Sequence, residues 1–277
     1  MDTVLQALIM GIVQGLTEFL PVSSSGHLVV VPYLFGWDDA FLNSLAFSVM
    51  LHVGTLVALL VYFRADWLRL VPAGLAALRD RSFRGDPDRK LAWLLAATTV
   101  PAALVGLLFN DVIEDQVRQV GLVAAMLVVG GVILWIADRL GRRDRPIEGV
   151  TFPVAIAIGA AQALALIPGI SRSGISISAA RLAGLDRQAA ARFAFLMATP
   201  ITAGAGIFEA RKLVTGEAGV DVALAPLVVG MVASLVAGLA AIHFMLRYLR
   251  TRSLAVFVWY RFALAVVVVA VIAVRGG

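Results

Sequence analysis

The fold is decided by the stretch Gln14–Gly26 (QGLTEFLPVSSSG), whose pattern returns 148 positions later at Gln162–Gly174 (QALALIPGISRSG). Both stretches run from a glutamine through apolar residues to a proline, and then into a short hydroxyl-rich turn that ends in glycine. Ala46-Phe47 recurs at Ala194-Phe195 with the same offset. A broken turn in an apolar setting cannot face lipid, because its backbone polar groups would lack partners. We therefore expect two related halves whose turns meet inside the protein.

The composition predicts an all-α polytopic membrane protein. Hydrophobic residues make up 61% of the chain, against roughly 45–50% apolar residues in soluble domains. Several stretches approach the ~20 apolar residues that a membrane helix needs. The six expected transmembrane helices cover about 43–63, 91–109, 120–138, 189–208, 224–246 and 254–274.

The net charge of +5 does not indicate a nucleic-acid partner. The basic residues cluster in the loops between apolar spans, as the positive-inside rule describes. We accordingly expect no nucleic acid among the partners. The chain has no cysteine, which excludes disulfides and thiolate catalysis.

The charges of the loops predict how the chain is threaded. The segment 64–90 carries seven basic side chains and is expected to be a solvated cytoplasmic connection, whereas 110–119 is mainly acidic and is expected outside. The same rule places Arg139, Arg142, Arg143 and Arg145 inside and the segment 209–221, with Glu209, Glu217 and Asp221, outside.

This threading leaves two regions that must begin and end on the same side of the membrane. We expect a re-entrant helix hairpin at 2–38, entering from outside, and another at 152–188, entering from inside. Each half, about 1–140 and 150–275, then consists of one hairpin and three crossings within a single membrane domain. An odd number of crossings inverts the second half, which is the inverted-repeat plan of many transporters.

The first turn carries a carboxylate that needs a partner. Gln14 and Glu18 are four residues apart and share one helix face, beside a stripe formed by Gly11 and Gly15 that allows close helix packing. A carboxylate within an apolar run costs at least ~2.5 kcal/mol on insertion scales. A metal ion, Arg172 or His27 could compensate Glu18, and a purely structural pair that locks the halves together is the alternative.

The two turns have the composition of an anion site. Serines just ahead of a helix cap its free N–H groups, and those groups with the helix dipole can hold an anion. The arginine of the second turn offers a planar fork that matches phosphate oxygens. We expect a phosphate or pyrophosphate group carried on a lipid, with plain helix capping as the alternative. His52 and His243 stand alone on apolar spans and are expected to pack or to form hydrogen bonds rather than to catalyse.

Two motifs resemble those of the bacterial undecaprenyl-pyrophosphate phosphatases of the bacitracin-resistance type. The first family motif is Glu or Gln, three residues, Glu, and then Phe-Leu-Pro-Val-Ser-Ser-Thr/Ser-Gly-His; here it runs from Gln14 to His27. The second, Pro-Gly-x-Ser-Arg-Ser-x-x-Thr, appears as Pro168 to Ser176. The likeness covers nearly the whole length. Gln14 removes one anionic metal ligand, while Ser25 and Ser176 keep a hydroxyl where threonine is common.

The resemblance implies a specific activity and setting. Such enzymes remove the terminal phosphate of the C55 isoprenyl pyrophosphate carrier and give the monophosphate that is reused in cell-wall synthesis. The resemblance also implies a divalent cation, Mg²⁺ or Ca²⁺, a site opening to the outer face of the bacterial plasma membrane, re-entrant hairpins in inverted repeats, and a homodimer.

The expected mechanism assigns roles to both turns. Glu18, helped by Gln14, would position the metal and orient His27 or the attacking group. Ser24 is the first candidate for the nucleophile and His27 for the proton relay, while His27 or water as the nucleophile stays open. Arg172 would act on the transferred phosphoryl group. The other expected substrate-binding residues are Ser23, Ser25, Gly26, Ser171, Ser173, Gly174 and Ser176.

A transporter or flippase for a polyprenyl phosphate, without hydrolysis, is the alternative function. Inverted repeats with broken helices are the usual architecture of that class, and an anion site at the turns suits it equally well. An ion channel is disfavoured, because the turns differ from each other and carry both signs of charge.

Overall fold

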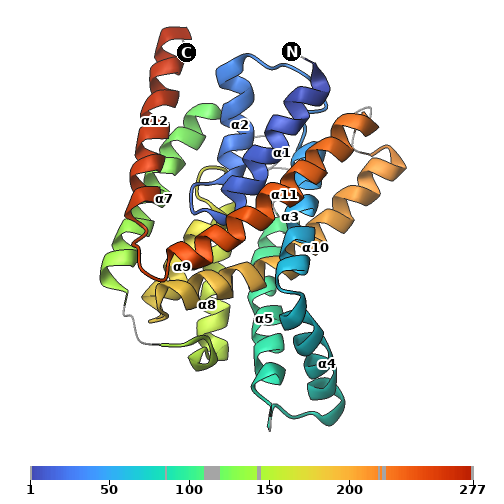
Figure 1. The fold of residues 1–277 in the computed structure, drawn as a ribbon, viewed down its shortest axis with the longest axis vertical. Coiled ribbons are helices and arrows are strands. Elements are labelled where there is room, and N and C mark those ends of the chain that lie inside the picture. The colour runs from blue at the N-terminus through green and yellow to red at the C-terminus, as the bar shows by residue number, and fades with distance from the viewer. Residues whose placement is uncertain are drawn as a thin grey trace.

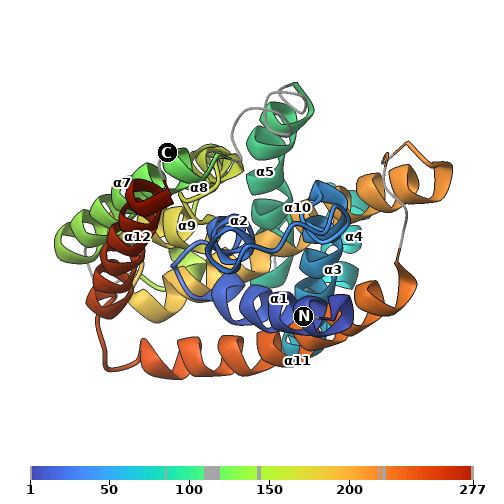
Figure 2. The ribbon, with the colours of Figure 1, turned by 90° about the horizontal axis from the view of Figure 1, so that it is seen from above.

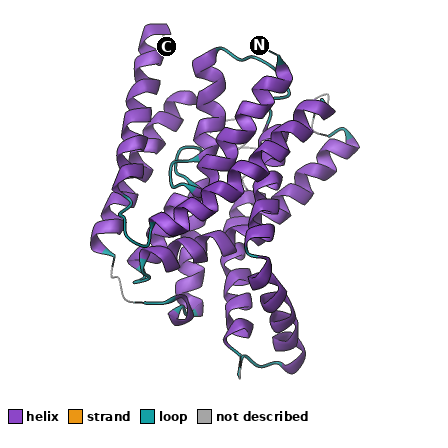
Figure 3. Cartoon of the chain, in the orientation of Figure 1, coloured by secondary structure: helices purple, strands orange, loops and turns teal. Residues whose placement is uncertain are grey.

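The computed structural model describes residues 2–84, 86–108, 119–141, 145–217, 219 and 223–275. Over these residues the chain consists of helices and connecting loops, without a strand (Figure 3). The helices are α1 (Thr3–Phe19), α2 (Ser24–Phe35), α3 (Leu45–Tyr62), α4 (Arg64–Asp80), α5 (Pro87–Leu108), α7 (Val120–Leu140), α8 (Phe152–Ala163), α9 (Arg172–Leu182), α10 (Arg187–Thr215), α11 (Leu224–Tyr248) and α12 (Ala255–Arg275), with short 3₁₀ turns η1 (Ile147–Gly149) and η2 (Leu164–Leu166).

All six predicted transmembrane helices are confirmed. Helices α3, α5, α7, α10, α11 and α12 are each long and apolar enough to cross a membrane, and they contain 18 to 29 residues. Their bounds agree with the predicted spans except for α10, which runs seven residues beyond the predicted end at 208 to Thr215. The protein is a multi-pass helical membrane protein.

Two pairs of shorter helices flank the two repeated turns. Helices α1 and α2 contain 17 and 12 residues, and α8 and α9 contain 12 and 11. At 1.5 Å per residue, the three shortest reach only about 17–18 Å, well below the ~30 Å of a bilayer core. In Figure 1, α1 and α2 lie in the upper part of the view, with α8 and α9 below them. The two turns lie between these pairs, within the bundle.

The prediction of a purely solvated connection at 64–90 is wrong for its first part. Helix α4 occupies residues 64–80 and packs along α5, and both reach toward the bottom of Figure 1. Its buried residues Leu70, Ala73 and Ala77 are spaced three and four apart, so they form one apolar helix face between the arginines. Trp93 Nε1 on α5 donates to the Gly74 carbonyl at 3.1 Å.

Several charged positions used for the threading lie outside the described residues. They are the acidic turn at 110–119 except for Gln119, the arginines Arg142 and Arg143, and Asp221. The inside and outside assignment of these loops therefore stays a prediction.

Helix α1 is held against α11 by the predicted small-residue stripe. Gly11 and Gly15 face α11, and a Cβ atom added to Gly15 would lie 2.6 Å from Ala237 Cβ. Figure 2 shows α1 and α11 side by side along one edge of the molecule. The close approach fixes the rotation of α1 about its axis, and so it determines where Gln14 and Glu18 point.

Replacing Gly15 with alanine should therefore destabilise the protein. The added methyl group would overpack the α1–α11 contact at a cost of about 1–3 kcal/mol. Gly204→Ala is the matched control, because Gly204 is also inside a helix but has open space where the Cβ would lie. Both variants gain helix propensity of about 1 kcal/mol. Thermal unfolding in detergent should give Gly15→Ala a lower midpoint than wild type and Gly204→Ala an equal or higher one. Equal midpoints for the two variants would contradict this packing.

Candidate active site

The two repeated turns have the same backbone geometry. Ser23 and Ser171 both have φ of +76° and stand at the N-cap positions of α2 and α9. Ser23 Oγ accepts from the Gly26 N–H at 3.2 Å, and Ser171 Oγ accepts from the Gly174 N–H at 3.1 Å. The predicted helix capping is therefore present in both turns, and it holds a backbone conformation that non-glycine residues rarely adopt.

The turns also bind each other directly. The Gly169 N–H donates to Ser23 Oγ at 3.1 Å, and Ser173 Oγ donates to the Leu20 carbonyl at 3.0 Å. The second turn thus supplies both donors, and the first turn supplies both acceptors. The structure brings the two halves together at the place that the sequence predicted.

Arg261 on α12 binds the backbone of both turns. Its side chain is fully buried and donates to the carbonyls of Pro21 (3.3 Å), Gly169 (2.6 Å) and Ile170 (3.0 Å). It also donates to the carbonyl of Leu127 on α7 at 3.0 Å. The guanidinium therefore satisfies carbonyls of both broken turns, which otherwise would be buried without partners. The sequence analysis did not single out this residue.

Glu18 lies at the centre of the junction, with a side chain only 3% exposed. Its Oε1 accepts from Nη2 of Arg172, and its Oε2 accepts from Ser24 Oγ. The sequence left a metal ion, Arg172 and His27 open as partners that could compensate the charge of Glu18. In the structure, Arg172 is the one of these that contacts the carboxylate. The carboxylate of Glu18, the hydroxyl of Ser24 and the guanidinium of Arg172 thus form one cluster.

Two further side chains converge on the same carboxylate oxygen. Gln14 Nε2 donates to Glu18 Oε2 at 3.0 Å, and His52 Nε2 lies 3.3 Å from it. His52 does form a hydrogen bond, as predicted, because its Nδ1 lies 2.7 Å from the Ser48 carbonyl. Its other nitrogen nevertheless faces the site, which the sequence analysis missed.

Thr202 on α10 is a second residue that the sequence analysis missed. Its Oγ1 accepts from Nη1 of Arg172 and donates to the Ala198 carbonyl at 2.7 Å. Arg172 is therefore held at both ends of its fork, by Thr202 and by Glu18. No sequence signal pointed to Thr202, because a single hydroxyl on an apolar helix does not show which way it faces.

His27 lies beside this cluster without contacting Glu18 through either ring nitrogen. Its Nδ1 is 2.7 Å from the Ser23 carbonyl, and its Nε2 is 2.7 Å from the Tyr260 hydroxyl, with the two rings stacked. A carbonyl can only accept, so Nδ1 carries a hydrogen. His27 thus binds the first turn to α12, and its predicted orientation by Glu18 is not present.

Comparison with known proteins places the chain in a family. The family model for bacitracin resistance protein BacA matches residues 7–267. The chain belongs to this family. It is 45% identical to an undecaprenyl-diphosphatase of a Nocardioides species, over 97% of this chain and 96% of that protein. It is 46% identical to proteins of the same name from Rubrobacter xylanophilus, over 97% and 98%, and from Gemmatimonas aurantiaca, over 99% of each. The resemblance given by the two motifs is confirmed.

The remaining family motif positions lie around the cluster. Ser25 Oγ and Ser23 Oγ are 3.4 Å apart, and Ser173 Oγ and Ser171 Oγ are 3.2 Å apart. Ser176 Oγ is buried and has no hydrogen-bond partner among the described residues. His243 bonds to the Tyr62 hydroxyl at 3.3 Å, as expected of a histidine on an apolar span.

The junction can hold an anion. Helix α2 begins at Ser24 and α9 begins at Arg172, so the positive ends of two helix dipoles lie at the two turns. The first N–H groups of a helix have no intrahelical acceptor and can bind phosphate oxygens. With the Arg172 guanidinium, these groups are suited to a phosphate that approaches the Ser24 hydroxyl.

The residues present also fit a hard divalent cation that is completed by substrate oxygens. Within the described ranges, no three His, Cys, Asp or Glu side chains gather as a closed metal site. Glu18 and the Ser24 hydroxyl are adjacent oxygen ligands, and Gln14 Oε1 is buried without a hydrogen-bond partner in the part of the chain that is described. Mg²⁺ commonly takes one or two carboxylates plus phosphate oxygens, so this donor set suits it.

Proposed function

We propose that this chain is an undecaprenyl-diphosphatase, which hydrolyses undecaprenyl diphosphate to undecaprenyl phosphate and inorganic phosphate. The lipid carrier is thereby returned to cell-wall synthesis, and bacitracin resistance is the corresponding phenotype. The name of the relatives over nearly the full length supports the reaction. The observation that carries it is the Glu18 carboxylate held between Ser24 and Arg172, at the start of two helices.

The diphosphate is proposed to bind between the two turns, with its lipid tail leaving sideways between helices. Arg172 and the first amides of α2 and α9 bind the phosphate oxygens. Ser23 and Ser171 shape the turns, because their hydroxyls already accept from Gly26 and Gly174. The sites predicted at Ser25, Ser173 and Ser176 remain proposed contacts to the substrate.

Ser24 is the proposed nucleophile. Its Oγ attacks the terminal phosphorus while its proton passes to the Glu18 carboxylate, and the bond from phosphorus to the bridging oxygen breaks. Undecaprenyl phosphate leaves, and water then hydrolyses the phosphoserine to release inorganic phosphate and restore the serine. A hydroxyl paired with a base that other groups orient is the arrangement of an activated nucleophile, and Gln14 and His52 orient Glu18 here.

Arg172 and His27 have supporting roles in this proposal. The Arg172 guanidinium stabilises the charge that builds on the transferred phosphoryl group, because its fork is already fixed by Thr202 and Glu18. His27 relays protons through the Tyr260 hydroxyl at 2.7 Å. Glu18, Gln14 and Ser24 would hold Mg²⁺ or Ca²⁺, which would neutralise the charge of the diphosphate when bound.

The proposal includes the architecture around the site. Each half, about 1–140 and 150–275, would contain a re-entrant hairpin and three crossings, with the second half inverted. The short helices beside each turn and the equivalence of Ser23 and Ser171 support it. We place the protein in the bacterial plasma membrane, with the site opening to the outer face, as a homodimer. The family resemblance supports these last assignments.

Purified protein in detergent should release inorganic phosphate from a polyprenyl diphosphate, and a chelator should abolish the release. Arg172→Ala should lower kcat by about 100- to 1000-fold, the typical effect of removing one donor to a developing charge. Arg211→Ala is the control, because Arg211 is an exposed arginine that pairs with Glu217 at 2.8 Å. It should retain wild-type turnover.

The same assay separates the enzyme from the transporter alternative. Detergent removes the bilayer and any gradient, so a transporter would release no phosphate in this assay. Wild-type turnover in a folded Arg172→Ala protein would remove the proposed role of the guanidinium. Absence of phosphate release from wild-type protein with every divalent cation tested would reject the diphosphatase.

A covalent intermediate on Ser24 should be detectable by rapid quenching with a substrate labelled in its terminal phosphate. The label should stay on the protein in acid, because phosphoserine is stable in acid whereas phosphohistidine is not. Ser24→Ala should abolish labelling, and Ser82→Ala should not, because Ser82 is a half-buried serine on the connection between α4 and α5. An acid-labile label that depends on His27 would assign the nucleophile to His27 instead.

A further inference from the structure

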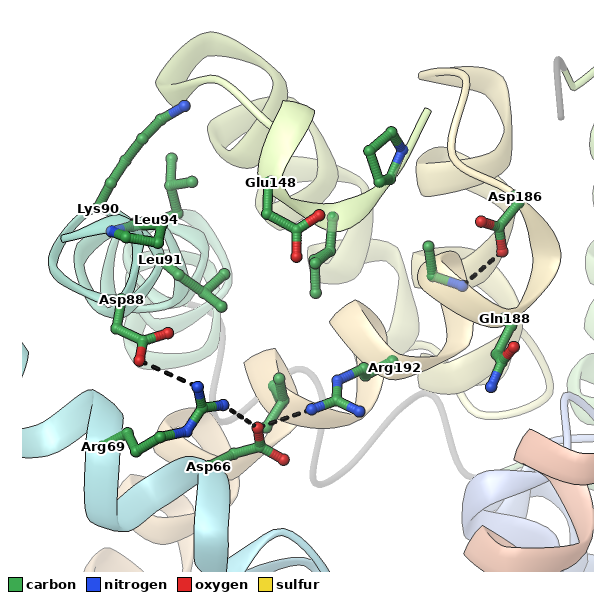
Figure 4. A pocket seen from close by; sticks show the side chains of 15 residues that line it. Asp66, Arg69, Asp88, Lys90, Leu91, Leu94, Glu148, Asp186, Gln188 and Arg192 are labelled. Carbon is green, nitrogen blue, oxygen red and sulfur yellow. Dashed lines mark hydrogen bonds and ion pairs between the residues drawn. The ribbon is translucent and has the colours of Figure 1, made fainter. Parts of the chain in front are cut away.

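A cavity of about 460 Å³ lies between α4, α5 and α10, and Glu18 is not among the residues that line it (Figure 4). Asp66, Arg69, Asp88 and Arg192 there already form ion pairs with one another. That cavity therefore has its main charges satisfied. Around Glu18, Arg172 pairs with Oε1, whereas Oε2 faces a ring nitrogen of His52.

The hydrogen bond of His52 determines which ring nitrogen presents a lone pair. Nδ1 lies 2.7 Å from the Ser48 carbonyl, one turn earlier on α3. A backbone carbonyl accepts and cannot donate, so Nδ1 carries a hydrogen. Nε2 is then the ring nitrogen that can offer a lone pair to a cation. Metal-binding histidines commonly show this pattern, with the second ring nitrogen donating to a backbone carbonyl.

Nε2 faces the Glu18 carboxylate, with which it forms an ion-pair contact. His52 Nε2 lies 3.3 Å from Glu18 Oε2. Two ligand atoms that are each about 2.1 Å from one cation are about 3.0–3.4 Å apart at angles from 90° to 109°. The nitrogen and oxygen are therefore spaced as adjacent ligands of a single divalent ion.

A third donor is present at the same place. Gln14 is completely buried, and its Nε2 bonds to Glu18 Oε2 at 3.0 Å. The Oε1 atom of the same amide has no hydrogen-bond partner among the described residues. A buried amide oxygen without a donor costs free energy, and coordination to a cation would satisfy it.

The other two of the three histidines of the chain are engaged elsewhere. Both ring nitrogens of His27 have partners in Ser23 and Tyr260, and His243 Nδ1 faces the Tyr62 hydroxyl. His52 is half-buried, with a side chain that is 23% exposed, beside a carboxylate that is 3% exposed. A hydrated cation can thus reach it more easily than Glu18 alone.

We propose that His52 Nε2 and Glu18 Oε2 are joint ligands of the divalent cation, with Gln14 Oε1 as the third protein ligand. This inference rests on the proposed diphosphatase function, because oxygens of the diphosphate complete the coordination. An imidazole ligand shifts the preference of the site from Ca²⁺ and Mg²⁺ toward first-row transition metals such as Mn²⁺ and Co²⁺.

The direct test is pulsed electron paramagnetic resonance on the purified full-length protein with Mn²⁺ and methylene diphosphonate. The wild-type spectrum should show modulation from one directly coordinated ¹⁴N nucleus, which ¹⁵N-histidine labelling should convert to the ¹⁵N pattern. His52→Gln should remove this signal and weaken Mn²⁺ binding at least about tenfold, with a smaller change for Ca²⁺. His243→Gln is the matched control and should keep both the signal and the affinity.

The outcomes separate this ligand assignment from the function. Bound Mn²⁺ without nitrogen modulation in the wild-type protein would overturn the assignment, and so would modulation that persists in His52→Gln. Because the first of these results needs no variant, it stands even if His52→Gln fails to fold. Phosphate release by a wild-type protein that lacks the nitrogen signal would leave the diphosphatase intact and reject only the histidine ligand.

Discussion

The contact between Glu18 and Arg172 is the interaction on which the rest of the structure depends. A buried carboxylate pairs with a half-buried guanidinium that comes from the second turn. Removing the guanidinium would leave the buried carboxylate without its opposite charge. The site therefore exists only when both halves are assembled. The five carbonyls that accept from Arg261 extend the same dependence to the backbone of both turns and of α7.

The two turns have similar backbone conformations, but they present different side chains to the Glu18 carboxylate. Ser24 and Arg172 are 148 positions apart, each directly after a capping serine and each at the first residue of its helix. One supplies a hydroxyl to Glu18 Oε2 and the other a guanidinium to Oε1. The similar parts of the two turns place both of them beside Glu18. The residues that differ between the turns, Ser24 and Arg172, are the ones that contact the carboxylate.

The sequence predicted the features that follow from apolar length and from turn composition. These include all six spans and the meeting of the two turns, while Arg172 was one of three partners that the sequence left open for Glu18. It could not predict which way single polar residues on apolar helices face, because that depends on how each helix is rotated by packing such as Gly15 against α11. His52, Thr202 and Arg261 were missed for this reason. Helix α4 was not predicted, because arginines lie in the sequence on both sides of the apolar residues that form its buried face.

The most direct test of the central contact is a double-mutant cycle in detergent with Glu18→Gln, Arg172→Gln and the double variant. The free energy of unfolding should fall markedly in each single variant, and the double variant should lose less than the sum of the two. A coupling of at least about 1 kcal/mol is expected for two side chains in direct contact. Additivity within about 0.5 kcal/mol would mean that the two halves do not share this ion pair and would contradict the account.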